Sequence, residues 1–474
     1  MSSGFSLARM VDSFRRQSFA DFAMGRIYPL IFIFLAFVGH SLGVEVFTIP
    51  IATILMVLGL IFAPGVRPLI PYAMTIVFHI SRQNSPGVPS SSTMLTTGFG
   101  LAAMIFSAVL LLFGITYFFI RRGLYRYVRR RHLFVLVPLF LFAVSLVING
   151  AFSDEWSVSS LIYGSLVAFV FVATFVMIFY GTKQDDRVVK YLSYVSMLVV
   201  ILLLLELAYA YYAGDVINDV EIVKSKIVFG WGVWNSMGLA LTQLIPLVFI
   251  GAYSRSRKRG FAYLFVAVLA LFGVMFTLSR GAFLVALFVF AALSVFMSFV
   301  SYHRVVYRTI SITTLAVAVL AIIAMGDRIP EVLGSLFDDN GRFALFSIGI
   351  ENFLEAPVFG KGFFGFEFPN DPNYFTGADF LPAMAHQTFI ELLSATGIVG
   401  LLLYLVYRVS TILPLFHKIS VKKVLLFASA LVVMLMSLVD NFMFSVWPTI
   451  TYSIALAVMM NDHSAESDTP LTND

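Results

Sequence analysis

Arg280, Arg342 and His386 are charged or titratable residues in a strongly apolar chain, at places where such groups are rare. Arg280 lies in Thr-Leu-Ser-Arg-Gly, between two long apolar stretches, and an ionisable group there is costly and suggests a function. Arginine can grip phosphate oxygens through two parallel hydrogen bonds. The neighbouring Ser279 and Gly281 favour a tight turn that approaches a ligand. The alternative is a side chain that only reaches for the membrane surface.

His386 begins the sequence His-Gln-Thr-Phe-Ile-Glu, directly before an apolar stretch. Histidine titrates near neutral pH and can act as a general base, although a single histidine is more often structural. Glu391 follows about one turn later and is a candidate to orient the helix start. Arg342 follows Asp338-Asp-Asn-Gly, so it either pairs with these acids or is oriented by them. Lys361, between two glycines, is a weaker candidate for contact with an anion, because a solvated loop lysine is the simpler interpretation.

The composition indicates which elements must position these residues. Of the 474 residues, 60% are hydrophobic and 12% are charged, whereas about 25% are charged in a typical soluble domain. These values exclude a soluble domain and a disordered chain, and they predict a polytopic membrane protein. The absence of cysteine excludes disulfides and Cys-ligated metal centres. The chain has no Walker loop and no His-Glu-x-x-His, so we do not expect bound nucleotide to drive its reaction.

Fourteen apolar stretches are candidate transmembrane helices, each of which needs about 20 residues. The weakest two, 48–63 and 68–81, belong to a segment broken by four prolines. If the N-terminus is cytoplasmic, 24 of the 31 Lys and Arg residues fall on the cytoplasmic side, as the positive-inside rule requires. Both termini are then cytoplasmic, and the basic loops are best explained as topology signals. Binding of nucleic acid or of anionic lipid is the less favoured interpretation of these loops. The stretches are 28–44, 48–63, 68–81, 98–120, 133–152, 159–181, 191–213, 231–252, 261–278, 282–300, 309–326, 392–408, 424–440 and 443–460.

One predicted loop is much longer than the others. It covers residues 327–391 on the outer face and is rich in aromatic residues, glycine and proline, and loops of this length are usually functional. Its aromatic side chains suit stacking on a ligand and packing equally well; they are Phe363, Phe364, Phe366 and Tyr374. The regions we expect are a cytoplasmic segment 1–27, helices 1–11 in 28–326, the cap loop 327–391, helices 12–14 in 392–460, and a disordered cytoplasmic tail 461–474.

Three further polar residues lie at membrane level. Glu206 is within an apolar stretch, where it is either a proton-relay carboxylate or a partner for an arginine. Asp440 and Asn441 end the thirteenth stretch on the outer side, where ordinary loop residues are the simpler interpretation.

Several short motifs follow one another in a specific order between about 230 and 460. They are Thr277-Leu-Ser-Arg280-Gly-Ala, Gly341-Arg342-Phe343, Glu355-Ala-Pro357-Val-Phe-Gly360-Lys-Gly362, His386-Gln387-x-x-Ile390 and Gly397-Ile-Val-Gly400. In this order, and on the outer face, they resemble the O-antigen ligase and polymerase family of bacterial integral-membrane glycosyltransferases. Gln387 stands where the family usually has Asn, and Ala395 where Glu is common. The N-terminal half is similar in topology alone.

The resemblance implies an all-α polytopic fold of the lipid-carrier-dependent glycosyltransferase (GT-C-like) type, with about 14 (12–14) transmembrane helices and one large periplasmic loop. It implies a bacterial inner-membrane location and a donor glycan on undecaprenyl pyrophosphate. The acceptor would be a sugar hydroxyl, on lipid A core in a ligase or on another carrier-linked repeat in a polymerase. The reaction would invert the anomeric centre without metal or cofactor. Candidate partners are the bilayer and other polysaccharide-assembly proteins. A nucleic-acid partner is not expected.

In this chemistry His386 would be the general base, and Arg280 and Arg342 would bind the pyrophosphate. The residues that would support them are Glu391, Lys361 and Ser279. Fourteen spans slightly favour an O-antigen or exopolysaccharide polymerase over a ligase. An alternative of another class is a transporter or flippase of lipid-linked glycans, but transporters usually place polar sites on broken helices near the bilayer midplane. The related cell-wall polymerases of the shape and division family share the expected architecture.

Overall fold

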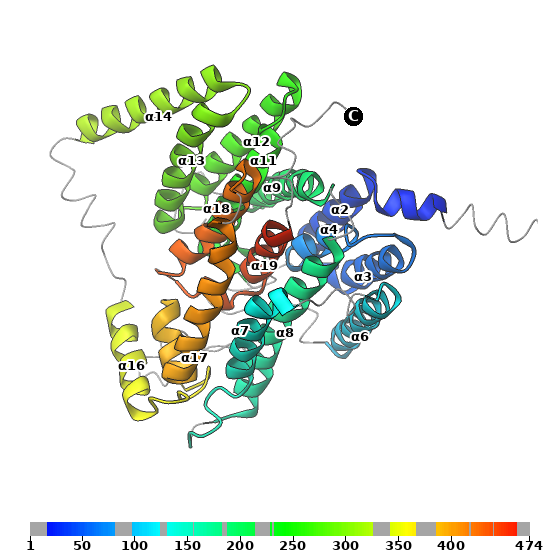
Figure 1. Cartoon of the computed structure of the whole chain (residues 1–474), viewed down its shortest axis with the longest axis vertical. Helices are drawn as coiled ribbons and strands as arrows, with labels where there is room; N and C mark the ends of the chain where they lie inside the picture. Colours follow the sequence, from blue (N-terminus) through cyan, green and yellow to red (C-terminus); the bar gives the residue numbers. More distant parts are fainter. Residues whose placement is uncertain are drawn as a thin grey trace, which may run out of the picture. The chain divides into compact units, whose positions relative to one another are not determined.

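The computed structural model describes residues 17–80, 97–123, 130–154, 156–182, 187–213, 228–229, 232–325, 342–365, 385–416, 419–438 and 440–461. The chain forms two compact units (Figure 1). Unit 1 comprises Met1–Arg129 and Val176–Val233, and unit 2 comprises Arg130–Phe175 and Trp234–Asp474. The described residues are almost all helical, and a short antiparallel pair, β1 (Val228–Phe229) and β2 (Gly232–Val233), is the exception among them.

Unit 1 is built from a small set of apolar helices. They are α2 (Ile27–Leu42), α3 (Glu45–Phe62), α4 (Leu69–Thr75), the 3₁₀ helix η1 (Ile76–His79), α6 (Gly98–Arg121) and α9 (Val188–Ala213). Helix α3 packs against α6 and α2, and α2 packs against α9. Gly114 permits the close approach of α6 to α3, because a Cβ atom there would lie 2.7 Å from Val57. Helix α6 is otherwise turned outward, and 17% of its apolar window is buried, against 61% for α9.

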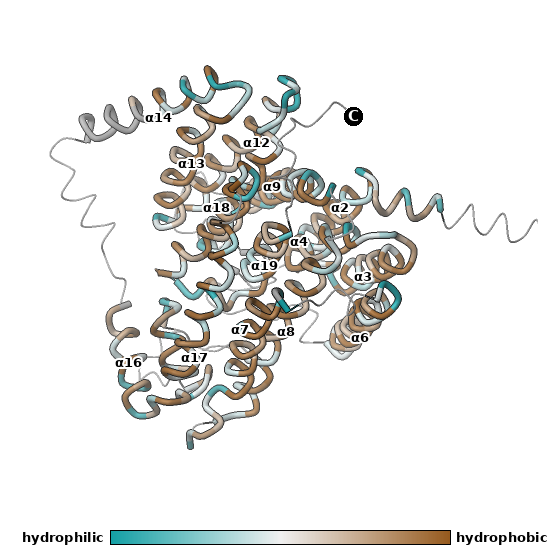
Figure 2. Tube along the Cα trace, viewed as in Figure 1, coloured by the Kyte–Doolittle hydropathy of each residue, from teal (hydrophilic) through white to brown (hydrophobic). Residues whose placement is uncertain are grey.

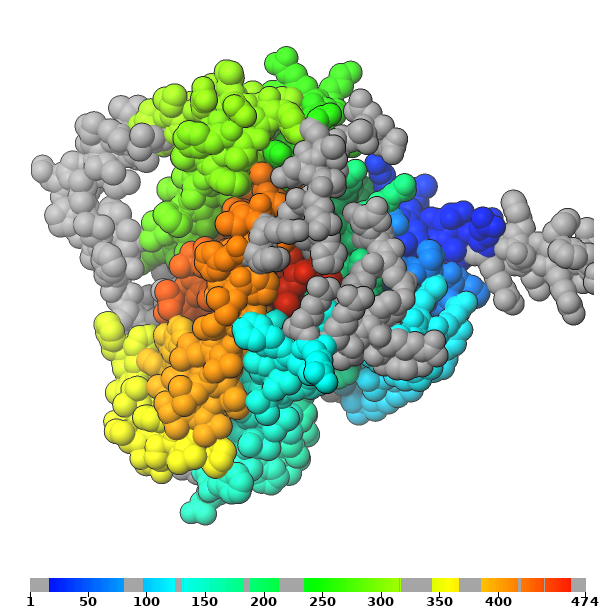
Figure 3. All heavy atoms as spheres, in the orientation of Figure 1, coloured from blue at the N-terminus to red at the C-terminus, as the bar shows by residue number. Residues whose placement is uncertain are grey.

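Unit 2 contains two groups of packed helices, one centred on α11 and the other on α17. Its helices are α7 (Arg130–Val147), most of α8 (Val158–Gly181), α11 (Trp234–Ala252), α12 (Arg257–Phe276), α13 (Arg280–Val300), α14 (Arg304–Met325), α16 (Arg342–Glu355), α17 (Thr388–Ile412), α18 (Val421–Met436) and α19 (Val446–Asn461), with the 3₁₀ helices η5 (Leu413–Phe416) and η6 (Phe442–Phe444). Helix α11 is the most buried span and packs against α12, α13 and α18. Helix α17 packs against α7 and α16, and their side chains fill the space between the ribbons (Figure 3).

The long apolar helices indicate a predominantly helical, multi-pass membrane protein. Within the described part of the chain, eight helices are long and apolar enough to cross a membrane, or nine if the bent pair Gln17–Ala23 and Ile27–Leu42 forms one span. Apolar residues predominate along the helices, and hydrophilic residues gather at helix ends and turns (Figure 2). The eight are Glu45–Phe62, Gly98–Arg121, Val158–Gly181, Val188–Tyr212, Trp234–Ala252, Arg257–Phe276, Arg280–Val300 and Thr388–Phe416.

The prediction of fourteen spans is not confirmed. Helical structure lies at each of the fourteen predicted positions, but α2, α18 and α19 have 16 residues each. Such a helix extends about 24 Å, less than the roughly 30 Å hydrocarbon core. The segment 68–81 forms only the short α4 and η1. Conversely, 48–63 lies, except for its last residue, within the single 18-residue helix α3, which contains Pro50 near its N-terminal end.

Arg408 has a different environment from the one predicted. The sequence places it at the cytoplasmic end of a span, but α17 continues to Ile412 and buries the residue to 3% exposure. Its guanidinium lies 4.5 Å from the ring centroid of Tyr404 and 4.1 Å from that of Tyr452. Cation–π contacts of this kind stabilise a charge that is removed from water.

Candidate functional site

His386 lies in the turn directly before α17 and is paired with a carboxylate. Its Nδ1 atom is 2.9 Å from Oδ1 of Asp440. The His386 side chain is 49% exposed, whereas that of Asp440 is 15% exposed. In the neutral imidazole a carboxylate holds the proton on the nitrogen that it contacts, so Nε2 keeps its lone pair. The arrangement therefore suits a histidine that accepts a proton from outside the protein.

The first turn of α17 fixes this pair in place. The side chain of Gln387 caps the helix, because its Oε1 accepts a hydrogen bond from the backbone N–H of Ile390 at 2.7 Å. The backbone N–H of Thr388 donates to the Ser437 carbonyl at 3.1 Å, and the Thr388 hydroxyl donates to the Asp440 carbonyl at 3.4 Å. Gln387 thus does the capping work for which asparagine is a preferred residue, and its departure from the family motif leaves the helix start intact.

Glu391 joins the two flanks of the His386–Asp440 pair. It is fully buried, and its Oε2 accepts a hydrogen bond from the backbone N–H of Ala385 at 2.8 Å and from Nδ2 of Asn441 at 3.2 Å. Asn441 in turn donates its backbone N–H to Oδ1 of Asp440 at 2.8 Å. One buried carboxylate therefore holds the residue before the histidine and the residue after the aspartate.

Two residues in the described ranges, Leu278 and His386, are non-glycine residues with positive φ. Their φ values are 59° and 51°, and this left-handed region costs a non-glycine residue roughly 1–2 kcal/mol. Such strain persists where the surrounding structure enforces it, and it is concentrated at functional sites. His386 is itself the candidate base, and Leu278 lies two positions before Arg280. Both strained residues therefore lie within the motifs that predicted the site.

The turn that carries Arg280 is built on polar contacts. Arg280 is exposed and begins α13. Ser279 is buried, and its hydroxyl donates to Oδ1 of Asn235, in the first turn of α11, at 2.7 Å. The hydroxyl of Thr277 accepts the backbone N–H of Ser279 at 3.4 Å. Sequence reasoning missed Asn235, although a polar residue at the start of an apolar helix was an available signal.

Helix α17 is broken at Gly397, whose backbone has φ 64° and ψ −165°. A loop formed by residues 357–362 fills the break. The N–H groups of Lys361 and Gly362 donate to the carbonyls that end the first half-helix, and the N–H groups of Ile398 and Val399 donate back to the loop. These four hydrogen bonds are Lys361 to Ser394 at 2.8 Å, Gly362 to Ala395 at 3.1 Å, Ile398 to Pro357 at 2.9 Å and Val399 to Val358 at 3.3 Å.

The break requires glycine at both partners. A Cβ atom on Gly397 would lie 2.4 Å from the Val358 carbonyl, and one on Gly360 would lie 2.4 Å from the Ala395 carbonyl carbon. Both glycines also have positive φ. Two motifs that are more than thirty residues apart in the sequence are thus the two sides of one backbone joint.

Lys361 and Phe363 serve the docking of this loop. Lys361 is buried, and its amine forms an ion pair with Glu355. Phe363 is fully buried, with ring centroids 5.1 Å from Tyr163 and 5.3 Å from Phe444. The Phe363 backbone N–H donates to Oδ1 of Asn149 at 3.1 Å. Phe363 is therefore a packing residue, and Phe364 is partly buried beside it. Phe366 and Tyr374 lie outside the described residues.

The structure brings some of the predicted site residues together. Hydrogen bonds connect His386 and Glu391 with Asp440 and Asn441 in one cluster. Ser279 belongs to a different cluster, because its hydroxyl bonds to Asn235. Arg342 begins α16, but its side chain lies outside the described part. The convergence of Arg280, Arg342 and His386 in one cavity therefore stays a prediction. Within the described residues no group of three or more His, Asp or Glu side chains could hold a metal ion.

Glu206 is buried in α9 of unit 1. Neither of its carboxylate oxygens has a hydrogen-bond partner among the described residues. The structure therefore supplies no arginine partner for it there.

A comparison with known protein families gives a match over part of the chain. Residues 265–405 match the family described as O-antigen ligase. This stretch is similar to O-antigen ligase domains. The comparison with curated proteins gave no match. The resemblance inferred from the motifs is confirmed over this stretch, and it indicates a membrane protein that processes glycans.

The matched stretch contains the motifs discussed above. It begins in α12 and ends in α17, so it includes Arg280, the loop 357–362, His386 and the break at Gly397. Asp440 and Asn441 lie beyond it. The histidine in the matched stretch is therefore paired with a carboxylate that the stretch does not contain.

Proposed function

We propose that the protein is a glycosyltransferase that transfers or polymerises oligosaccharide repeats carried on undecaprenyl pyrophosphate, on the periplasmic face of the bacterial inner membrane. The observation that carries the proposal is the half-exposed His386, bound through Nδ1 to Asp440 and held in a left-handed turn. The similarity of the surrounding stretch to O-antigen ligase domains supports the same class of reaction.

In the proposed reaction His386 is the general base. Its Nε2 takes the proton of the attacking sugar hydroxyl while that oxygen bonds to the anomeric carbon of the donor. The bond from the anomeric carbon to the pyrophosphate oxygen breaks on the opposite side, so the configuration inverts. Asp440 stabilises the imidazolium that forms, as a carboxylate does when it holds the far nitrogen of a catalytic histidine. General-base catalysis of this kind contributes about 10²–10⁴-fold.

The proposed role of Arg280 and Arg342 is to stabilise the pyrophosphate as it leaves. Preorganised cations aimed at developing negative charge supply a large part of enzymatic rate enhancement. Arg280 has the exposure that this role needs. Ser279 is a positioning residue in this scheme, because its bond to Asn235 ties the turn to α11.

We propose a polymerase acting on O-antigen or exopolysaccharide repeats, with a ligase that transfers glycan to lipid A core as the alternative. Gene disruption separates the two. Loss of a polymerase leaves a single repeat on the final acceptor. Loss of a ligase leaves the acceptor bare while polymer remains on its lipid carrier, and that outcome would assign the protein as a ligase.

The broken helix α17 gives some support to a transporter, because transporters build their sites from such helices. In a transporter the free backbone groups at the break bind substrate. Here the loop 357–362 occupies carbonyls of the first half-helix and N–H groups of the second. The break is therefore closed by the chain itself, which favours a transferase over a transporter.

The test of the proposed function is turnover of purified protein in detergent, supplied with carrier-linked glycan. A transferase lengthens the glycan or moves it to an acceptor in this single compartment, whereas a pure transporter has no reaction to perform. Absence of any product, with donor and acceptor confirmed to be competent in native membranes, would reject the proposal.

A further inference from the structure

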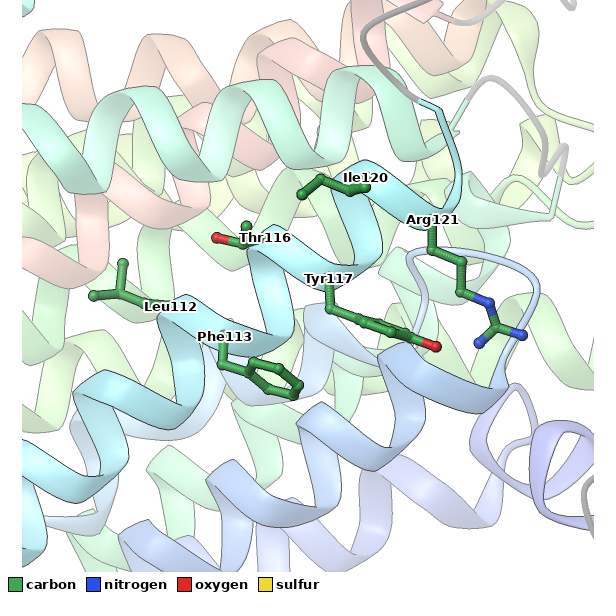
Figure 4. Close-up of a pocket in the computed structure, with 6 residues that line it drawn as sticks. All are labelled: Leu112, Phe113, Thr116, Tyr117, Ile120 and Arg121. Carbon is green, nitrogen blue, oxygen red and sulfur yellow. The ribbon is translucent and has the colours of Figure 1, made fainter.

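Helix α6 of unit 1 has an outward face that ends in a cation. Six residues on one face of this helix line a hollow (Figure 4). They form two adjacent rows, and within each row the residues are four positions apart in the sequence. One row is Leu112, Thr116 and Ile120, and the other is Phe113, Tyr117 and Arg121. At 1.5 Å per residue the rows extend about 14 Å along the helix. The face is thus an apolar stripe with a guanidinium at one end.

The aromatic row leads directly to this guanidinium. The rings of Phe113 and Tyr117 are stacked, with centroids 6.0 Å apart. The Arg121 guanidinium lies over the Tyr117 ring, 5.6 Å from its centroid. Figure 4 shows both rings and the guanidinium on the same side of the helix. The cation is therefore held in line with the stripe.

A second cation lies beside the first. Arg121 donates to the Ile61 carbonyl and Arg122 to the Ala63 carbonyl, at the end of α3. Burial, and next the neighbouring Arg121 charge, lower the pKa of the Arg122 guanidinium. Within the described residues neither arginine has a carboxylate partner, and the buried Nε of Arg122 has no hydrogen-bond partner. Two like charges at the end of α6 thus lack a compensating anion among the described residues.

We propose that this face binds an anionic phospholipid, with an acyl chain along the stripe and the phosphate at Arg121. The occupant must be apolar along the helix and negatively charged at its Arg121 end, and an anionic lipid has both properties. Basic residues at the end of a membrane helix attract such lipids. A helix C-terminus also favours cations, but that effect requires neither the stripe nor the stacked rings. This site goes beyond the proposed reaction, and its residues lie in unit 1.

The test uses the full-length protein, purified and stripped of lipid in detergent. Phosphatidylglycerol or phosphatidylcholine is added back, and bound lipid is counted by native mass spectrometry together with the shift in melting temperature. We expect phosphatidylglycerol to bind at least tenfold more tightly than phosphatidylcholine. Arg121→Gln should reduce this preference to within about twofold. The matched control is Arg257→Gln, because Arg257 is likewise exposed at a helix end with its guanidinium 5.5 Å from a ring four residues on, and it should keep the preference.

Several results would overturn the proposal. Equal binding of the two lipids would mean that the face is only solvated by the bilayer. An equal loss in Arg121→Gln and Arg257→Gln would mean general charge attraction. Stronger binding of undecaprenyl phosphate than of phosphatidylglycerol would assign the face to the carrier instead. If Arg121→Gln fails to fold, Tyr117→Leu removes the ring under the guanidinium, and an unchanged preference in that variant would reject the site.

Discussion

The buried histidines of unit 1 and the exposed histidine of unit 2 have opposite surroundings. His79 is fully buried with Nδ1 3.0 Å from the Thr48 hydroxyl, and His40 is buried with Nδ1 3.2 Å from the Ile80 carbonyl. Both have backbones without left-handed strain. His386 is half exposed, faces a carboxylate and has positive φ. Residue type alone therefore says little, whereas exposure, partner and backbone strain together distinguish a packing histidine from a candidate base.

The largest effect should come from the histidines themselves. We expect His386→Ala to lower turnover by about 10²–10⁴-fold because the base is lost, with the protein still inserted in the membrane. The comparison variant His79→Gln should lower thermal stability but leave turnover per folded molecule unchanged. Glycan transfer and melting temperature, measured on both purified variants, check this. Near-normal chain length with a verified His386→Ala protein would remove the base assignment.

The carboxylate partner should have the next largest effect. We expect Asp440→Asn to lower kcat by about 10²-fold with little change in KM, because an amide no longer fixes the proton on Nδ1. Asp440→Glu should restore part of the activity. A change confined to KM, or no rescue by glutamate, would indicate that Asp440 only supports the turn.

Arg280 tests whether the second motif belongs to the same chemistry. We expect Arg280→Lys to lose most activity, about 10–10²-fold, because lysine keeps the charge but lacks the two-pronged donor set. Arg257→Lys, an exposed arginine at the start of α12, should retain full turnover. If both variants behave alike in the transfer assay, Arg280 is a surface residue of its turn.

The smallest effect should distinguish the buried carboxylates of the two units. We expect Glu391→Gln to reduce turnover by about three- to tenfold, since the amide can still accept the Ala385 bond but carries no charge. Glu206→Gln, in unit 1, should leave turnover unchanged. Both variants are measured in the glycan-transfer assay. A larger loss of turnover in Glu206→Gln than in Glu391→Gln would assign the functional carboxylate to unit 1.

The sequence predicted where helices form, but not which of them span a membrane. Hydropathy identifies apolar stretches, and helical structure lies at every one of the fourteen predicted positions. The number of spans depends on how long each helix is once turns and prolines have interrupted it. The short α4 and η1 illustrate this. Arg408 shows the same limit, because one of the aromatic rings that cover it, Tyr452, comes from α19.

The candidate site was predictable where it depends on local sequence and not where it depends on packing. His386, Arg280 and Glu391 are recognisable from their local sequence. Asp440 is 54 residues from its histidine, and Asn235 is 44 residues from Ser279, so only packing could reveal either pair. The departure at Gln387 needed the structure as well, because its capping bond explains why a different amide suffices.

The break at Gly397 has a consequence for how an acceptor can enter. Four peptide hydrogen bonds tie the loop 357–362 to the two halves of α17, and unmaking such bonds away from water costs several kcal/mol for each exposed group. The loop and the helix that carries His386 at its start therefore move as one rigid body. If the proposed reaction takes a long glycan, we expect any opening that admits it to hinge at other segments, with the histidine kept in place.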